Sequence, residues 1–285
     1  MKPYHETEHG VLYCGDCLDV MKQFEDDSID LTVTSPPYDN LRDYKGYTFD
    51  FENIAKELLR VTKPGGVIVW IVGDATVNGS ETGTSFRQAL YFKEIGFNLH
   101  DTMIYEKDTV SFPDSHRYQS QFEYMFVLSK GKPLTFNPIK IRSQYRADNK
   151  VISDRTKSGI TEKKRIVSSS SMRVKGNVWR YAVGYNKSTS DKIAFQHPAI
   201  FPEQLAADHI LSWTNKGDTV LDCFFGSGTT GKCAAKYGRR YIGIELSEEY
   251  CEITANRIDT EVDQMDIFRE VCLISEPMRG NNAKP

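Results

Sequence analysis

The chain has 285 residues, of which 39% are hydrophobic, and a formal net charge of −3. This is enough to bury a sizeable core, in one large domain or two smaller ones. No apolar run approaches the roughly 20 residues needed to span a bilayer, and the N-terminal stretch MKPYHETEHG lacks the apolar segment of a signal peptide. The six cysteines do not have the spacing of a small disulfide-rich secreted domain, so we expect reduced thiols in a cytoplasmic protein with no membrane partner.

Strand-like and helix-like segments alternate along most of the chain. In chain order, the patterns of the first half predict a strand at 29–34, a helix from 51, a strand at 67–72, a helix at 85–97 and a strand at 123–129. Asp50 is expected to cap the helix from 51, and Pro64-Gly65-Gly66 to end it. The second half predicts a helix beginning near Pro202, a strand at 219–222, a helix at 229–238, a strand at 240–245 and a helix at 247–258 that is capped by Ser247. The strands are almost continuously apolar. This alternation predicts an α/β fold with a doubly wound, mostly parallel, Rossmann-like sheet.

One basic window interrupts the pattern. Residues 131–195 contain fifteen Lys or Arg and four Asp or Glu, a net charge of +11, which leaves −14 for the rest of the chain. A solvated basic loop would also explain such a run. However, Tyr145, Trp179, Tyr181 and Tyr185 lie among the cations, and aromatic rings can pack against sugars and bases while cations attract phosphates. We therefore predict an inserted region that binds nucleic acid.

These observations divide the chain into four parts. We expect a first α/β part at 1–130, the inserted region at 131–195, a second α/β part at 196–260 and a peripheral tail at 261–285; the family resemblance described below implies that the first part is the catalytic half and the second the cofactor-binding half. Cys14 and Cys17 form a lone CxxC pair. A zinc site would need a second pair at a suitable spacing, so buried structural thiols are favoured and no metal is expected.

A glycine-rich loop joins the strand at 219–222 to the next helix. Gly226, Gly228 and Gly231 match the GxGxxG pattern of dinucleotide-binding proteins, and Glu245 follows at about the distance of a ribose-binding acid. A nicotinamide-dependent oxidoreductase is therefore one alternative. A pyrophosphate, however, needs a bare and positive helix N-terminus, whereas Asp222 and two phenylalanines precede these glycines. An acid at this point favours the α-amino group of S-adenosylmethionine.

A rigid corner follows the strand at 29–34. Ser35-Pro36-Pro37-Tyr38 ends the strand with two fixed φ angles and no backbone donor at either proline. The Pro36 carbonyl and the Ser35 hydroxyl could accept hydrogen bonds from an exocyclic amine of a nucleobase, and the Tyr38 ring could stack on a base that is drawn out of the helix. A strand-ending turn without chemistry would carry the same residues.

Together these motifs resemble one family, the amino-directed DNA methyltransferases, which modify cytosine at N4 or adenine at N6. The segments TSPPY, ELLRVTKPGGVIVW, EYMFVLSKG, HPAIFPEQLA, VLDCFFGSGTT and RYIGIELSEEY carry the resemblance, and their order is similar to the β-type arrangement of the family. Cys223 stands where the family usually has proline. The resemblance implies double-stranded DNA as the substrate, and it leaves open a homodimer and a cognate restriction endonuclease as further partners.

The resemblance also assigns roles to residues. The catalytic set that it implies is Ser35, Pro36, Pro37 and Tyr38. The S-adenosylmethionine-binding set is Asp16, His197, Pro198, Phe201, Pro202, Asp222, Phe224, Gly226, Gly228, Glu245 and Leu246. The DNA-binding candidates are Arg42, Tyr44, Lys163, Lys164, Arg165, Arg173 and Lys175.

Serine at the start of the proline motif is typical of cytosine-N4 enzymes, so we expect cytosine-N4 methylation, with adenine-N6 as the alternative. Methylation at carbon 5 of cytosine needs a cysteine nucleophile, and the sequence contains no Pro-Cys pair. A DNA-binding protein with an inactive methyltransferase body is the remaining alternative.

Overall fold

The computed structural model describes residues 1–37, 49–109, 116–143, 150–166 and 171–275. The chain divides into two compact units, one formed by Met1–Asn137 with Asn177–Pro285, and the other by Pro138–Gly176. The window at 131–195 therefore contributes to both units. Among the described helices, none is both long and apolar enough to cross a membrane.

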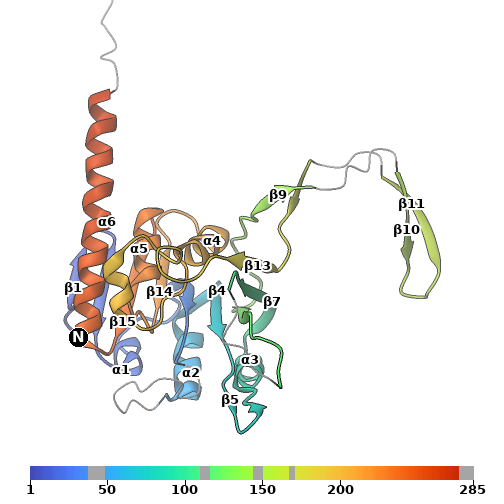
Figure 1. The fold of residues 1–285 in the computed structure, drawn as a ribbon, viewed down its shortest axis with the longest axis horizontal. Helices are drawn as coiled ribbons and strands as arrows, with labels where there is room; N and C mark the ends of the chain where they lie inside the picture. Colours follow the sequence, from blue (N-terminus) through green and yellow to red (C-terminus); the bar gives the residue numbers. More distant parts are fainter. Residues whose placement is uncertain (38–48, 110–115, 144–149, 167–170, 276–285) are drawn as a thin grey trace, which may run out of the picture. The chain divides into compact units, whose positions relative to one another are not determined.

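The first unit is built on one nine-stranded sheet (Figure 1), with the strand order β1-β2-β15-β14-β3-β4-β8-β7-β13. Its strands are β1 (His5–Thr7), β2 (Gly10–Cys14), β3 (Ile29–Thr34), β4 (Thr62–Val72), β7 (Asn98–Lys107), β8 (Phe122–Ser129), β13 (Val178–Tyr181), β14 (Thr219–Asp222) and β15 (Arg240–Glu245). The neighbouring strands are parallel except at β1–β2, β4–β8 and β7–β8. The predicted mostly parallel, Rossmann-like α/β fold is confirmed.

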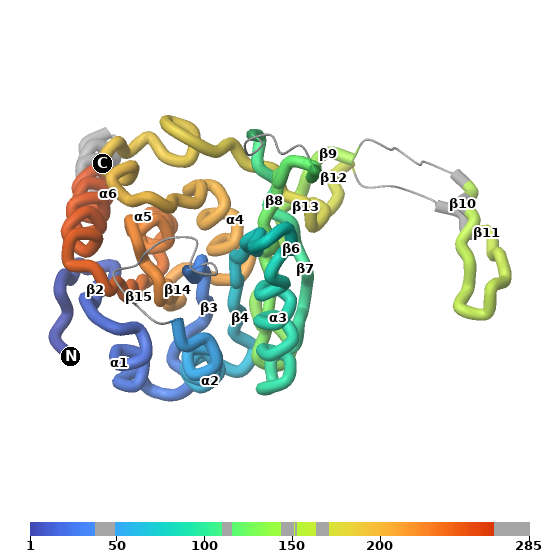
Figure 2. The backbone as a smooth tube through the Cα atoms, turned by 60° about the horizontal axis from the view of Figure 1, so that its bottom comes forward, coloured from blue at the N-terminus to red at the C-terminus, as the bar shows by residue number. Residues whose placement is uncertain are grey.

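Helices cover both faces of this sheet. The elements are α1 (Cys17–Met21), α2 (Phe51–Val61), α3 (Thr84–Ile95), the 3₁₀ helix η1 (Lys192–Gln196), α4 (Glu203–Trp213), α5 (Thr229–Lys236) and α6 (Glu248–Ser275), with a small hairpin of β5 (Thr76–Val77) and β6 (Ser80–Glu81). Helices α1, α2 and α3 pack side by side, as do α4, α5 and α6, and Figure 2 shows the two sets on opposite sides of the sheet.

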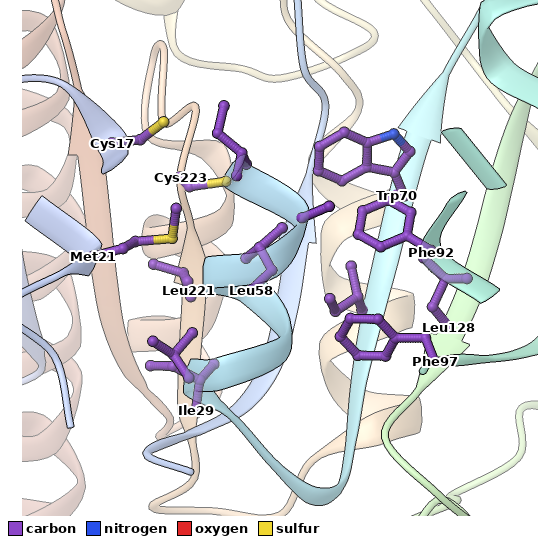
Figure 3. Packing of buried hydrophobic residues seen from close by; sticks show 14 of the residues in the cluster. Cys17, Met21, Ile29, Leu58, Trp70, Phe92, Phe97, Leu128, Leu221 and Cys223 are labelled. Atoms are coloured by element: carbon purple, nitrogen blue, oxygen red, sulfur yellow. The ribbon is translucent and has the colours of Figure 1, made fainter. Parts of the chain in front are cut away.

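One hydrophobic cluster of the core lies between the sheet and the layer of α1, α2 and α3 (Figure 3). Trp70 of β4 is fully buried, with its ring against Phe92 and its Nε1 donating a hydrogen bond to Gln88 (2.8 Å). The apolar spacing that predicted α2 buries Ile54 and Leu58 against this cluster. The core therefore fixes the strands whose ends carry the motifs.

Three details of the helix ends differ from the sequence-based expectation. The sequence pattern predicts that the last helix ends at 258, but α6 continues to Ser275, into the segment expected to be a tail. Asp50 caps α2 as predicted, but α2 ends at Val61 and the Pro64-Gly65-Gly66 stretch lies inside β4. The Ser247 hydroxyl was expected to cap α6 but makes no hydrogen bond to the described residues. Its backbone N–H donates to the carboxylate of Glu245 (2.9 Å).

The second unit consists of two short antiparallel pairs. Strand β9 (Lys140–Arg142) pairs with β12 (Met172–Val174), and β10 (Lys150–Arg155) pairs with β11 (Thr161–Ile166).

Candidate active site

A cavity of about 1160 Å³ opens in the first unit, at the edge of the sheet where β3, β7, β14 and β15 have their carboxyl ends. Strand ends of this kind form the binding crevices of open α/β sheets. Its wall combines segments far apart in sequence, which are Gly15–Cys17, Ser35–Pro37, Tyr105, Lys107, Glu123, Val183–Tyr185, Ser188, Phe195, His197–Phe201, Cys223–Ser227, Thr229, Ile244–Leu246 and Tyr250. The proline corner and the glycine loop thus share one cavity.

The glycine loop is shaped by backbone conformations that favour glycine. Gly226 has φ +50° and Gly228 has φ +75°. A Cβ on Gly226 would lie 3.0 Å from the His197 ring, and one on Gly228 would lie 2.6 Å from Thr254. A side chain at either position would therefore displace the loop or these neighbours, so both positions require glycine.

Asp222 lies behind this loop and does not line the cavity. Its side chain accepts hydrogen bonds from Thr34 (2.6 Å), from Thr230 (2.8 Å) and from the Phe224 N–H (3.1 Å). Burial raises the pKa of Asp222 to about 6, although these three donors act to lower it. The acid thus links the end of β3, which precedes the proline corner, to the start of the glycine loop.

Glu245 lies at the end of β15 and lines the cavity. Its Oε2 accepts a hydrogen bond from Gly226 N–H (2.8 Å) and its Oε1 accepts one from Ser247 N–H (2.9 Å). Burial raises its pKa, against the effect of these backbone donors. Each oxygen of an ionised carboxylate can accept a second hydrogen bond, so the residue can also accept from the two hydroxyls of a ribose.

The proline corner forms another part of the wall. Ser35, Pro36 and Pro37 line the cavity directly after β3. Tyr38, Arg42 and Tyr44 lie outside the described residues. The Thr34 hydroxyl binds Asp222 as described above, so the corner and the glycine loop are joined by a buried hydrogen bond.

His197 packs between the glycine loop and α6. Its ring lies edge-on to Tyr250, with 4.4 Å between the ring centroids, and its Nδ1 lies 2.6 Å from the Ala199 carbonyl oxygen. These contacts, together with its approach to Gly226, fit a residue that positions the cavity wall.

The other predicted cofactor residues are distributed over the wall and behind it. Asp16, Pro198, Phe201, Phe224 and Leu246 line the cavity. Asp16 also caps α1 by accepting from Leu18 N–H (2.8 Å). Gly228 and Pro202 do not line the cavity, and Pro202 is buried at the start of α4.

Phe224 and Cys223 are held in place by packing against buried residues of the first unit. The Phe224 ring packs edge-on against Phe49 (5.7 Å between centroids) and Trp70 (6.3 Å), which anchors the loop to the aromatic core. The Cys223 thiol is buried, its Sγ lies 3.9 Å from Thr34 Oγ1, and burial raises its pKa well above the ordinary value. It is therefore an inert part of the wall rather than a nucleophile.

Sequence reasoning missed a buried cluster of charges behind the glycine loop. The Arg257 guanidinium donates to the Ser227 backbone carbonyl, to Glu203 (2.9 Å) and to Asp191 (3.2 Å). Lys232 donates to the same two acids, at 2.9 and 2.7 Å. Burial acts to raise the pKa of Asp191, but the two cations outweigh it and lower that pKa. A single cation within a helical stretch gives no sequence signal for such a role.

A second polar group in the wall also escaped prediction. Lys107 Nζ lies 2.6 Å from a Glu123 carboxylate oxygen and 5.8 Å from the centre of the Tyr105 ring. These residues come from the end of β7 and the start of β8. They give the wall a paired charge on the side of the cavity formed by these two strands.

The aromatic residues of the basic window have two different environments. Trp179 is buried and stacks on His209, and Tyr181 is buried and donates to Asp208 (2.8 Å). The expectation that these two rings face a nucleic acid is wrong, because β13 is a strand of the main sheet and turns both side chains inward. Tyr185 is exposed at the cavity, and Tyr145 lies outside the described residues.

Apart from Arg42, the predicted DNA-binding cations belong to the second unit. Lys163, Arg173 and Lys175 are described and exposed or half-buried there. Lys164 and Arg165 are placed by the backbone of β11.

The residues present fit S-adenosylmethionine. Glu245 can accept from ribose hydroxyls, and the Gly226 backbone lines the same cavity beside it. The cavity is large enough for a cofactor of this size together with a nucleobase.

Known structures share this architecture. PvuII DNA methyltransferase (cytosine-N4-specific) superposes with a TM-score of 0.66 at 23% identity, over 92% of this chain and 93% of its own. The M1.HpyAVI–SAM complex superposes with a TM-score of 0.59 at 21% identity, over 87% of this chain and 98% of its own. The fold is that of the S-adenosylmethionine-dependent DNA methyltransferases.

Sequence comparison identifies the family. The model of the family described as DNA methylase, N6_N4_Mtase, matches residues 29–256. The orphan methyltransferase M.BamHII of Bacillus amyloliquefaciens is 60% identical over 237 residues, which cover 82% of this chain and 89% of that protein. The chain belongs to the N4/N6 DNA methylase family, which uses S-adenosylmethionine, and the resemblance seen in the sequence is confirmed.

Proposed function

We propose that this protein transfers a methyl group from S-adenosylmethionine to the exocyclic N4 of a cytosine in double-stranded DNA, after the cytosine has been flipped out of the helix. The observation that carries this proposal is the single cavity shared by Ser35-Pro36-Pro37 and by Gly226 with Glu245. A bound cofactor and an extruded base can meet there.

The proline corner provides the acceptors that the amine requires. An exocyclic amine is a poor nucleophile because its lone pair is delocalised into the ring. Hydrogen bonds to the Pro36 carbonyl and the Ser35 hydroxyl favour a more tetrahedral nitrogen, whose lone pair is then available for bond formation. No strong base is needed in advance, since the nitrogen becomes acidic only as the new bond forms.

The residues on the cofactor side of the cavity bind and orient S-adenosylmethionine. When bound, S-adenosylmethionine supplies an electrophilic methyl group on a sulfonium. Glu245 binds the ribose hydroxyls, and the glycine loop with Asp222 behind it shapes the site of the methionine portion. Tyr38 stacks on the base, so Tyr38→Ala is expected to reduce turnover far more than cofactor affinity.

The choice of cytosine-N4 over adenine-N6 rests on Ser35. Serine at this position is typical of N4 enzymes, and a fold neighbour, PvuII DNA methyltransferase, is named as cytosine-N4-specific. The structural difference between a hydroxyl and a carboxylate as acceptor is small, so the base must be identified chemically.

A direct experiment tests the proposal. The protein is incubated with double-stranded DNA and labelled cofactor, and the DNA is digested to nucleosides and analysed by mass spectrometry. We expect N4-methylcytosine, and its absence after Ser35→Ala. N6-methyladenine would overturn the base assignment, while DNA binding without any labelled product would favour an inactive DNA-binding protein.

A further inference from the structure

The second unit contains a hairpin with a defined tip. Strands β10 and β11 pair antiparallel from Lys150↔Ile166 to Arg155↔Thr161. At the tip, Thr156 N–H donates to the Ile160 carbonyl (2.8 Å) and Ile160 N–H donates to the Thr156 hydroxyl (3.1 Å). Gly159 has φ +83°, a conformation that favours glycine. The strand register therefore follows from the turn.

This register divides the residues of the two strands between two unlike faces of the ladder. Directly paired residues share a face, and the face alternates along each strand. One face carries Val151, Ser153, Arg155, Thr161, Lys163 and Arg165, with three cations and no acid. The other carries Lys150, Ile152, Asp154, Glu162, Lys164 and Ile166, where two acids balance two cations. We call these the basic face and the balanced face.

Little of the hairpin is buried. Of the residues in 150–166 whose side chains are described, all except Thr156 are exposed, including Val151 (55%) and Ile160 (64%). An isolated two-stranded hairpin is at best marginally stable in water. A partner that covers one face would therefore stabilise it.

The tip also orients one guanidinium. Arg155 Nε donates to the Gly159 carbonyl (3.1 Å). Its two terminal nitrogens make no hydrogen bond within the described part of the chain and keep their donors for a ligand. A guanidinium held in this way can donate two parallel hydrogen bonds to guanine O6 and N7.

We propose that the basic face of this hairpin enters the major groove of DNA and contacts base edges, while the balanced face points away from the DNA. The major groove, about 12 Å wide, admits a two-stranded ribbon. Arg155 and Lys163 supply donors for bases, and Ser153 and Thr161 supply small polar contacts. Asp154 and Glu162 would be repelled by the phosphates if the ribbon entered with the other face. The inference rests on the proposed action on DNA and makes it more specific.

Adjacent lysines allow a matched test. Lys163→Ala and Lys164→Ala remove the same charge, one residue apart, from the basic and the balanced face. A preferred duplex is first selected from a random-sequence library by binding to the full-length protein, which does not depend on methyl transfer. Affinity is then measured for this duplex and for a scrambled one at fixed salt, with Arg155→Ala as a second basic-face variant.

We expect Lys163→Ala and Arg155→Ala each to reduce the preference for the selected duplex by about 5- to 100-fold, in line with the energy of direct base contacts. Lys164→Ala should weaken binding to both duplexes by a similar small factor, as a general electrostatic contribution does. Unchanged thermal melting and cofactor affinity would show that the variants are folded.

Equal effects of Lys163→Ala and Lys164→Ala on the preference would overturn the assignment of faces, as would selection of no preferred sequence. Failure of the proposed function would be seen in a different experiment, in which the wild-type protein would yield no methylated nucleoside. The two failures are therefore distinguishable.

Discussion

At the scale of single residues, Asp222 is a carboxylate held almost out of reach of water. It is 1% exposed and accepts hydrogen bonds from Thr34, Thr230 and Phe224. Burial nevertheless outweighs these donors and raises its pKa to about 6 from an ordinary value of 3.8. At neutral pH the folded protein therefore carries a buried charge that destabilises it, and this charged side chain connects the end of β3 with the glycine loop.

This charge predicts a pH dependence. Because the folded state binds the proton more tightly, the stabilisation due to protonated Asp222 is complete below pH 3.8 and is lost as the pH rises through about 6. Asp222→Asn keeps the shape of the side chain and can form hydrogen bonds with the same neighbours. Because asparagine does not ionise, the variant does not lose this stability as the pH rises. Relative to wild type, the variant should gain on the order of 2 to 3 kcal/mol between pH 4 and pH 7. Urea unfolding at several pH values measures the difference.

A surface acid serves as the control for this measurement. Asp19→Asn removes the same charge from a side chain that is 69% exposed, and its unfolding is measured at the same pH values. A profile for Asp222→Asn that is parallel to that of wild type would contradict the raised pKa.

Glu245 predicts a cofactor effect. Glu245→Gln replaces one accepting oxygen by a donor, which then opposes the Gly226 or the Ser247 N–H. In the proposed complex one ribose hydroxyl also loses its carboxylate acceptor, and the loss of a hydrogen bond to a charged group costs roughly 1.5 to 3 kcal/mol, so affinity for S-adenosylmethionine should fall by about 10- to 100-fold. Glu248→Gln makes the same charge change at an exposed position in the first turn of α6, and calorimetric titration should find its affinity close to that of wild type.

At the scale of elements, the last glycine of the GxGxxG pattern is a packing residue. A Cβ on Gly231 of α5 would lie 2.3 Å from the Phe225 ring. Gly231→Ala should therefore destabilise the protein by about 1 to 3 kcal/mol, as overpacking does, despite the better helix propensity of alanine. A Cβ on Gly176 would meet nothing within 4 Å, so Gly176→Ala should change stability little. Equal melting temperatures for the two variants would rule out the packing role.

Elements with strong local signals were predictable, and those decided by distant contacts were not. The apolar run at Ile29–Thr34 and the cap at Asp50 appear in the structure where the sequence places them. Ser247 has the right residue type for a cap, but its hydroxyl makes no hydrogen bond to the described residues. Trp179 and Tyr181 stand in a basic window, yet pairing of β13 with β7 buries them. Strand pairing at long range cannot be read from composition.

At the scale of the whole molecule, the site combines two distant stretches of the chain. Ser35 and Gly226 line one cavity because β3 and β14 are neighbours in the sheet. The residue types in the two motifs were sufficient to predict from the sequence that the proline corner and the glycine loop share one site. Arg257, which binds the Ser227 carbonyl from α6, could not be proposed, since its partners lie in three segments that are far apart in the sequence.

The separation of the two units predicts that cofactor binding and DNA binding can be uncoupled. All described residues that line the cavity belong to the first unit, whereas Pro138–Gly176 form the second. Replacing residues 138–176 by a flexible Gly/Ser linker of about 10 residues, which spans roughly 18 Å on average, should leave S-adenosylmethionine affinity within about threefold of that of the full chain. Loss of the second unit's cations should weaken DNA binding and flatten its dependence on salt.

Parallel titrations of the full chain and the shortened protein with cofactor and with DNA, at several salt concentrations, test this uncoupling. Circular dichroism serves as the folding control, because the sheet and the helices of the first unit should persist. A shortened protein that is folded but does not bind the cofactor would show that the second unit is needed to form the site. An unchanged salt slope would show that the DNA-binding charge lies elsewhere.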